Sequence, residues 1–225
     1  MTAVPCPPLH STPSPGRSRP IVFVVDDDVS VRECLELMIR EAGWQPQLFG
    51  SAQHFLEHPR PGLPCCLVLD VNLPGLDGLE LQEQLADESH RMPIIFITGY
   101  GDVPKTVRAM KAGAVEFLTK PFDYDVLLRA IGDALERSRH AREREQSSRS
   151  LREAHESLTP REREILLLVV AGRLNKLIAA ELGISEITVK AHRGRVMRKM
   201  HARSVPDLVK MAAQLHLLAE GELQG

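Results

Sequence analysis

Short apolar segments alternate with amphipathic segments along residues 20–136, and this alternation restricts the possible folds more than any other feature of the sequence. The apolar segments are rich in β-branched residues, as expected for strands buried on both faces of a sheet. They are Ile21–Val25, Leu48–Phe49, Leu67–Leu69, Ile94–Ile97 and Val115–Leu118. Between them, apolar residues recur at three- and four-residue steps, which is typical of helices. The alternation predicts an α/β domain with a five-stranded, parallel, doubly wound sheet.

A second pattern begins at residue 158, where the apolar spacing predicts helices alone. The segment Thr159–Glu162 supplies threonine as N-cap, proline at the first helical position and glutamate at the third, which is a capping box. Gly172 is expected to end this helix, and Gly183 to separate a second short helix from a third that Ser185 caps. A fourth helix follows. Residues 158–225 are therefore predicted to form a small all-α domain.

Two segments lie outside these patterns. Residues 1–19 hold five of the sixteen prolines and no periodic apolar pattern, so we predict a disordered tail. Residues 137–157 are mainly Arg, Glu, Ser, Gln and Ala. We predict that they continue the last helix of the α/β domain, residues 20–136, as a helical linker to the second domain. A disordered linker is the alternative.

The composition excludes several classes of protein. No apolar segment approaches the roughly 20 residues that a membrane-spanning helix needs, and the N-terminus does not resemble a secretory signal. The four cysteines lack metal-ligand spacing and are expected to be reduced thiols. We therefore expect a cytoplasmic protein with no membrane partner.

The small net charge of −2 conceals an asymmetry between the two predicted domains. Residues 20–136 contain nine Lys and Arg against 19 Asp and Glu, whereas residues 158–225 contain 11 basic and seven acidic residues. An acidic and a basic domain in one chain indicate different partners, and nucleic acid is a candidate partner for the basic one.

Polar residues follow four of the predicted strands. Three aspartates, Asp26–Asp28, follow the first strand, and Asp70 follows the third. Thr98 follows the fourth strand and Lys120 the fifth. Because the carboxyl ends of parallel strands meet at one edge of a sheet, these side chains are expected to converge there. Carboxylate oxygens crowded together repel one another unless a cation lies among them, and oxygen ligands suit Mg²⁺.

The same set of residues suits phosphoryl transfer. An aspartate carboxylate can attack phosphorus and form an aspartyl-phosphate. Catalysis of this transfer depends on positioning and charge neutralisation, which a metal ion, Lys120 and the hydroxyl of Thr98 would supply. A single aspartate at a strand end more often only caps a helix, but the agreement of four strand ends favours a functional site.

Four separated motifs resemble the signature segments of receiver domains. They are Val24–Asp28, Leu69–Gly75, Ile97–Gly99 and Lys120–Phe122. The resemblance implies that Asp70 accepts a phosphoryl group from a sensor histidine kinase. It also implies that Asp26, Asp27 and Asp70, with the backbone carbonyl of Asn72, hold Mg²⁺.

The resemblance further implies a switch. Thr98 and Lys120 match the switch hydroxyl and the phosphate-pairing lysine, and the Lys120–Pro121 bond is expected to be cis. Phe117, three residues before the lysine, would change rotamer on phosphorylation, or it is only a core residue. Family members dimerise through the surface that changes, here residues 103–136. Asp28 has either a helix-capping role or none of these roles.

The third helix of the second domain is basic. Its apolar stripe of Val189, Val196 and Met200 is expected to pack against the other helices. The opposite side would present small and basic residues to the major groove of DNA, namely Lys190, Ala191, Gly194, Arg195 and Arg198. A basic helix face is often only solvated, but a preceding short helix and glycine turn favour DNA binding.

Three segments, Leu158–Glu164, Asn175–Ala179 and Ile187–His192, resemble the LuxR-type helix-turn-helix domain. Together with the receiver, the chain resembles FixJ-like regulators and is similar to styrene-responsive regulators. The resemblance implies that Lys190, Ala191 and Gly194 face bases. It places nearer to phosphates the side chains of Thr188, Arg193, Arg195 and Arg198. Many relatives carry a long polar side chain at position 194, so the glycine puts direct base readout there in question.

The sequence therefore predicts a response regulator that acts as a transcription factor and is not an enzyme. Phosphorylation on Asp70 would control homodimerisation and binding to double-stranded promoter DNA, with RNA polymerase as a further partner. Two alternatives remain open. One is a metal-dependent phosphohydrolase that uses the same aspartates, and the other is a constitutive DNA-binding or scaffolding protein.

Overall fold

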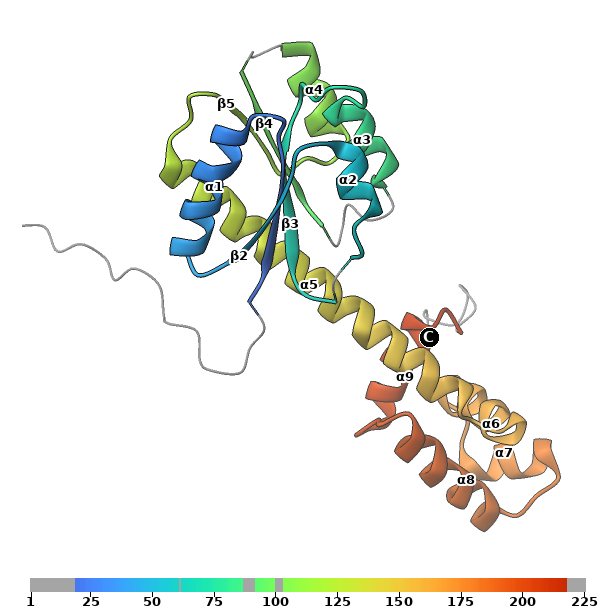
Figure 1. Ribbon diagram of the computed structural model, residues 1–225. Helices are drawn as coiled ribbons and strands as arrows, with labels where there is room; N and C mark the ends of the chain where they lie inside the picture. The colour runs from blue at the N-terminus through green and yellow to red at the C-terminus, as the bar shows by residue number, and fades with distance from the viewer. Residues whose placement is uncertain (1–18, 61, 87–91, 100–102, 218–225) are drawn as a thin grey trace, which may run out of the picture. The chain divides into compact units, whose positions relative to one another are not determined.

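The computed structural model describes residues 19–60, 62–86, 92–99 and 103–217 (Figure 1). The chain divides into two compact units, Met1–Arg142 and Glu143–Gly225. The tail predicted over residues 1–19 lies outside the described residues, apart from its last residue. Within the described part of the chain, no helix combines the length and apolar character that crossing a membrane requires.

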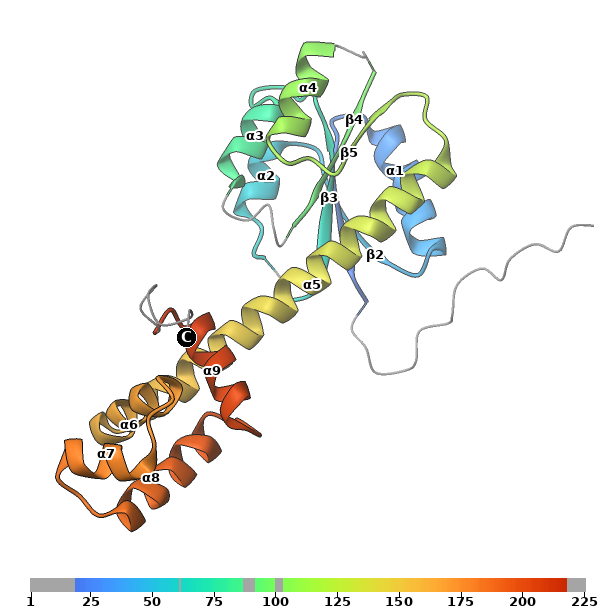
Figure 2. The same ribbon diagram turned by 180° about the vertical axis from the view of Figure 1, so that it is seen from behind.

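The first unit contains a parallel sheet of five strands in the order β2-β1-β3-β4-β5. The strands are β1 (Ile21–Val25), β2 (Gln45–Phe49), β3 (Cys65–Asp70), β4 (Ile94–Thr98) and β5 (Glu116–Thr119). Helices cover both faces: α1 and α5 pack on one, and α2, α3 and α4 on the other (Figures 1 and 2). The predicted parallel, doubly wound α/β fold is confirmed.

The helices of this unit are α1 (Val29–Glu41), α2 (Ala52–Glu57), α3 (Gly78–Gln84), α4 (Val103–Lys111) and the first part of α5 (Tyr124–Glu156), which continues into the second unit after Arg142. The central strands have both faces buried because alternate residues enter different layers. Phe23 of β1 packs in the layer of α2 and α3, while Val22 and Val24 pack in the layer of α1 and α5.

The edge of the sheet differs in detail from the prediction. Strand β2 begins at Gln45 rather than at Leu48, because its first three residues pair with β1 as well. The sequence did not reveal these residues as part of a strand, since their side chains do not alternate between polar and apolar. Helix α2 was not predicted, because its six residues are too few to show helical periodicity. The main core residue of α2 is Phe55, whose ring packs edge-on against the rings of Phe23 and Phe49.

Helix α5 is 33 residues long and includes residues 137–156 of the predicted linker. Within the first unit, the buried Ser138 of α5 accepts a hydrogen bond from the backbone N–H of Cys65 at 3.1 Å. Arg142 donates to the Cys65 Sγ at 3.8 Å. These two contacts hold the middle of α5 against the beginning of β3.

The second unit contains helices α6 (Pro160–Val170), α7 (Asn175–Leu182), α8 (Glu186–Lys199) and α9 (Val205–Gln214). The predicted capping box is confirmed: Thr159 caps α6, and Glu162 accepts a hydrogen bond from the backbone N–H of Thr159. Gly183 ends α7 with a φ of 63°, a left-handed conformation that favours glycine. Ser185 then caps α8, as predicted.

Candidate functional site

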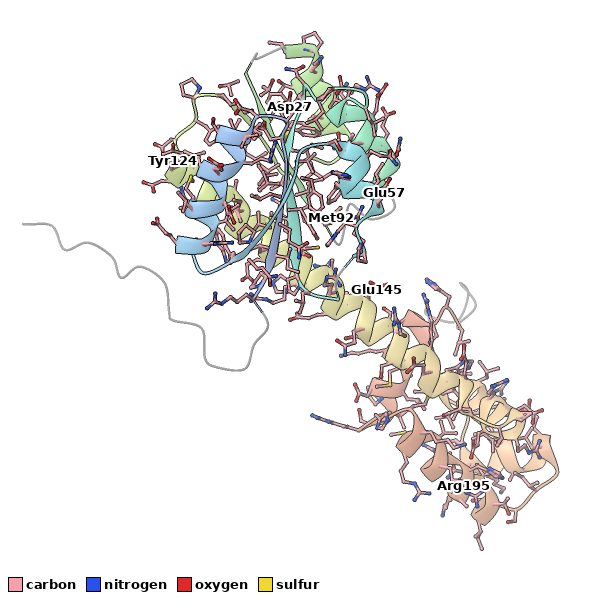
Figure 3. The ribbon with its side chains drawn as sticks, in the orientation of Figure 1. Asp27, Glu57, Met92, Tyr124, Glu145 and Arg195 are labelled. Carbon is pink, nitrogen blue, oxygen red and sulfur yellow. The ribbon has the colours of Figure 1, made fainter. Side chains whose placement is uncertain are left out.

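The acidic pocket lies at the carboxyl ends of the central strands. Val25 of β1 pairs with Leu69 of β3, so the residues that follow, Asp26 and Asp70, lie side by side. Both are buried, whereas Asp27 is exposed (Figure 3). One carboxylate oxygen from each of the three aspartates lies within 4.8 Å of the others. The predicted convergence of these carboxylates is therefore observed.

Lys120 enters this pocket from the end of β5. Its backbone N–H donates to the carbonyl of Thr98 at 2.7 Å, which places it beside the end of β4. Its Nζ lies 2.7 Å from Oδ2 of Asp26 and 3.0 Å from Oδ2 of Asp70. The peptide bond between Lys120 and Pro121 is cis, as predicted. One ammonium group therefore bridges two carboxylates from different strands.

Burial and ion pairing shift the pKa values of these groups in opposite directions. Burial raises the pKa of Asp26 above its usual value, and the hydrogen bonds from Lys120 and the backbone of Asp28 offset only part of this effect. Burial alone would lower the pKa of Lys120, but hydrogen bonds to Asp26 and Asp70 outweigh it and raise that pKa. The pocket holds three carboxyl groups against one ammonium, an excess that a divalent cation would neutralise.

Of the other predicted switch residues, Thr98 lies at the pocket and Phe117 lies outside it. Thr98 is buried at the end of β4, and its Oγ1 accepts a hydrogen bond from Nδ2 of Asn72 at 3.4 Å. The backbone N–H of Asn72 donates to Oδ1 of Asp70 at 3.3 Å. Phe117, in the middle of β5, is half-buried and lies 6.0 Å from Phe96, measured between ring centroids. The structure thus brings Thr98 close to Asp70 and leaves Phe117 one strand farther along the sheet.

The basic helix forms the second candidate site. Val189, Val196 and Met200 of α8 are buried in the core of the second unit, which confirms the predicted stripe. The opposite side of α8 is exposed, and Arg195 projects from it (Figure 3). The exposed residues predicted to face DNA are Lys190, Ala191, Gly194, Arg195 and Arg198.

Two of the predicted DNA-contacting residues also make contacts within the unit. The half-buried Arg193 donates from Nη1 to Oδ1 of Asn175, at the start of α7. The hydroxyl of Thr188 lies 2.8 Å from that of Ser185, the N-cap of α8. Both residues therefore support the turn between α7 and α8, and a phosphate would have to share or replace these contacts.

Comparison with known proteins finds a matching family for each half of the chain. Residues 22–132 match the response regulator receiver domain family, and residues 156–212 match the LuxR family of bacterial regulatory proteins. Nodulation protein W of Bradyrhizobium diazoefficiens is 50% identical over 202 residues, which cover 90% of this chain and 89% of the relative. The chain belongs to the two-component response regulators.

Further relatives agree with this assignment. The response regulator protein TodT of Pseudomonas putida is 44% identical over 195 residues, covering 87% of this chain and 86% of TodT. The solved structure of the response regulator StyR superposes with a TM-score of 0.81 at 49% identity, over 88% of this chain and all of that one. Members of this family are transcription factors rather than enzymes, so we reject the alternative that the protein is a phosphohydrolase. A receiver joined to a LuxR-type domain implies a histidine kinase and DNA as partners.

Sequence reasoning missed three residues that shape the acidic pocket of this response regulator. Gly78, the first residue of α3, lies so close to β3 that a Cβ would be 2.4 Å from the carbonyl oxygen of Asp70. Arg32 donates to the backbone carbonyl of Asp26 at 2.6 Å. Lys105 of α4 donates to Oδ1 of Asn72 at 3.3 Å. Their partners are distant in sequence or are backbone atoms, so no local spacing signals these roles.

Asp28 has the capping role that the sequence left open. Its Oδ1 accepts a hydrogen bond from the backbone N–H of Ser30 at 2.8 Å, and it is the N-cap of α1. Its own backbone N–H donates to Oδ1 of Asp26 at 2.9 Å. Asp28 therefore orients Asp26 through its backbone while its side chain begins the helix.

Proposed function

We propose that Asp70 is the phosphoacceptor of this response regulator. The observation that carries the proposal is the position of the Lys120 Nζ, which bridges Asp26 and Asp70 beside the exposed Asp27. A carboxylate oxygen of Asp70 attacks the phosphorus of a phosphohistidine on the sensor kinase. The P–N bond breaks, and the electron pair leaves with the histidine nitrogen.

The pocket fits a magnesium ion. Asp26, Asp27 and Asp70 offer oxygen atoms within 4.8 Å of one another, and hard oxygen donors are the ligands that Mg²⁺ prefers. The backbone carbonyl of Asn72 would complete the protein ligands. When bound, the ion neutralises charge on the phosphoryl oxygens.

The remaining residues of the pocket would hold and sense the phosphoryl group. Lys120 already lies at hydrogen-bond distance from Asp70, so its ammonium group is placed to pair with a phosphoryl oxygen. Thr98 would exchange its hydrogen bond from Asn72 for one to the phosphoryl group, and Phe117 would follow its movement. The surface of α4, β5 and α5 would then change and form a homodimer.

The second unit would carry the output to DNA. Lys190, Ala191 and Gly194 would face bases in the major groove of promoter DNA. The residues nearer to phosphates would be Thr188, Arg193, Arg195 and Arg198. Residues 20–136 would act as the receiver, 137–157 as the linker and 158–225 as the DNA-binding domain. RNA polymerase is a further partner, and the DNA target places the protein in the bacterial cytoplasm.

The decisive experiment measures phosphate incorporation from a small acyl-phosphate donor with Mg²⁺, in the wild type and in Asp70→Asn. Labelling of the wild type alone, with tighter DNA binding, is expected. Asp70→Asn is a matched control because it removes one charge and keeps the shape of the side chain. Equal labelling of both proteins would refute the assignment of Asp70. DNA affinity that does not respond to labelling would favour the constitutive binding protein.

A further inference from the structure

Ile187 is an exposed apolar residue at an unexpected place. It lies in the first turn of α8, and 80% of its surface is exposed, more than for any other large hydrophobic residue in the described parts of the chain. Neither the phosphorylation site nor the core of the second unit uses its side chain. The isoleucine therefore requires another explanation.

The position of Ile187 on the helix places it with the exposed DNA-facing residues. At about 100° per residue, Ile187 lies within about 20° of Gly194 and Arg198 around the helix axis. The buried Val189 and Val196 lie about 160–180° away by the same measure. The side chain thus points directly away from the core, on the side that carries the proposed DNA contacts.

The shape of this face suits close approach to DNA. A Cβ built on Gly194 would meet no atom within 4 Å, so the glycine leaves open space about two turns along from Ile187. Ala191 adds a second small side chain between them. With small residues at these two positions, the beginning of α8 can enter a groove more deeply, and the first turn of a recognition helix is the part that contacts base edges.

We propose that Ile187 contacts the 5-methyl group of a thymine in each half-site of the operator. An isoleucine side chain neither donates nor accepts hydrogen bonds, and the thymine methyl is the apolar group that bases present in the major groove. Arg195 and Arg198 supply charge that attracts any DNA, whereas an apolar contact distinguishes thymine from the other bases. The inference rests on the proposed DNA-binding function of α8.

The expected loss of affinity follows from the apolar surface that one methyl group buries in the contact. Removing one methyl group from an apolar contact weakens affinity about three- to five-fold. A homodimer on two half-sites makes the contact twice, so changing both thymines is expected to weaken binding about ten-fold or more.

The test uses the full-length chain, phosphorylated with a small acyl-phosphate donor and Mg²⁺. Binding sequences are first selected by the wild type from a library of random duplexes. Each thymine of a selected sequence is then replaced by deoxyuridine, which removes only the methyl group, and the Kd is measured for wild type and Ile187→Ala at one fixed salt concentration. Leu167→Ala, which truncates an exposed residue of α6 in the same unit, is the matched control.

We expect one thymine in each half-site at which deoxyuridine weakens the wild type and Leu167→Ala about three- to five-fold but leaves Ile187→Ala unaffected. On unmodified DNA, Ile187→Ala should bind more weakly than the wild type by about ten-fold or more, like the wild type on a duplex in which both of these thymines are replaced. If Ile187→Ala keeps the wild-type response to deoxyuridine at every position, the inference is wrong while DNA binding by α8 stands. If the wild type itself selects no sequence, the proposed DNA recognition fails, and the inference fails with it.

Discussion

At the scale of single residues, the geometry of the acidic pocket depends partly on positions without charge. Gly78 is one of them, because α3 begins where β3 ends and the two backbones almost touch. Its backbone N–H donates to the carbonyl of Val71 at 3.0 Å, which ties the helix to the strand that carries Asp70. Asp77 caps the same helix and accepts a hydrogen bond from the N–H of Leu79 at 2.9 Å.

Replacing Gly78 by alanine should therefore disturb both folding and phosphorylation. The new Cβ would lie 2.4 Å from the carbonyl oxygen of Asp70, so the strand end or the helix must shift. We expect a loss of about 1–3 kcal/mol in the free energy of unfolding, measured by urea denaturation. Labelling of Asp70 should also be slower.

Gly132→Ala is the matched control, because Gly132 lies inside α5 and a Cβ there meets no atom within 4 Å. This substitution should stabilise the first unit by about 0.5–1 kcal/mol. If both alanine variants had the same stability, the close approach at Gly78 would not matter.

At the scale of secondary-structure elements, the first turn of α6 is held by a buried charge. Glu162 accepts hydrogen bonds from the backbone N–H of Thr159 at 2.9 Å and from Nζ of Lys199 at 2.7 Å. The hydrogen bond from Lys199 lowers the pKa of Glu162 from 4.5 to about 2, with the N–H of Thr159 as the next cause. Lys199 also donates to the carbonyl of Ser157 at 2.9 Å, so it serves the fold rather than DNA.

This interaction predicts a dependence of stability on pH. Because the folded pKa of Glu162 is below the unfolded value, its stabilising effect is fully present above about pH 4.5 and is lost as the pH falls towards about 2. At neutral pH, Glu162→Gln should lower the free energy of unfolding by about 1 kcal/mol. The difference between wild type and variant should shrink across that pH window in thermal unfolding experiments. A difference that stays constant to pH 2 would contradict the assignment.

Helix α8 leads to a second prediction at this scale. Lys190→Ala should weaken binding to a selected operator by about 1–3 kcal/mol and relax the base preference at one position, because a base contact is lost. Arg195→Ala should weaken binding to all sequences alike. It should also reduce by about one the slope of the logarithm of affinity against the logarithm of salt concentration. Titrations at several salt concentrations separate the two effects. Unchanged affinity, salt slope and preference in Lys190→Ala would refute its placement at the bases.

At the scale of the whole molecule, the proposed switch depends on a surface of the first unit that is outside the acidic pocket. Helix α4 exposes apolar residues one helical turn apart, at Val103, Val107 and Met110. Such a row, spaced at i, i+4 and i+7, forms one face of the helix. It is the surface on which the proposed dimer would close after phosphorylation.

A charge on this surface should separate phosphorylation from dimerisation. Val107→Glu should be labelled at Asp70 like the wild type but remain monomeric in analytical ultracentrifugation, because a carboxylate at an apolar interface must be desolvated. Its DNA affinity should then no longer rise on phosphorylation. Leu37→Glu, on the exposed face of α1, is the control and should dimerise normally. A phosphorylated dimer of Val107→Glu would place the interface elsewhere.

The sequence by itself determined much of this protein. The alternation of strands and helices, the capping box at Thr159 and the turn at Gly183 follow from local rules of backbone geometry and burial, and the structure contains all three. The positions of Asp26, Asp70 and Lys120 at the ends of the first, third and fifth strands were also enough to predict that they converge, because parallel strands end at the same edge.

The tertiary structure alone decided the remaining contacts. The approach of Gly78 to Asp70, the contact of Lys105 with Asn72 and the full extent of β2 depend on atoms brought together from separate elements. The exposure of Ile187 was also decided by the tertiary structure. Periodicity identifies the buried stripe of α8, but it does not show which of the outward side chains are left uncovered by neighbouring elements. The physical reason is that periodicity and capping act over a few residues, whereas close packing joins residues far apart in the sequence.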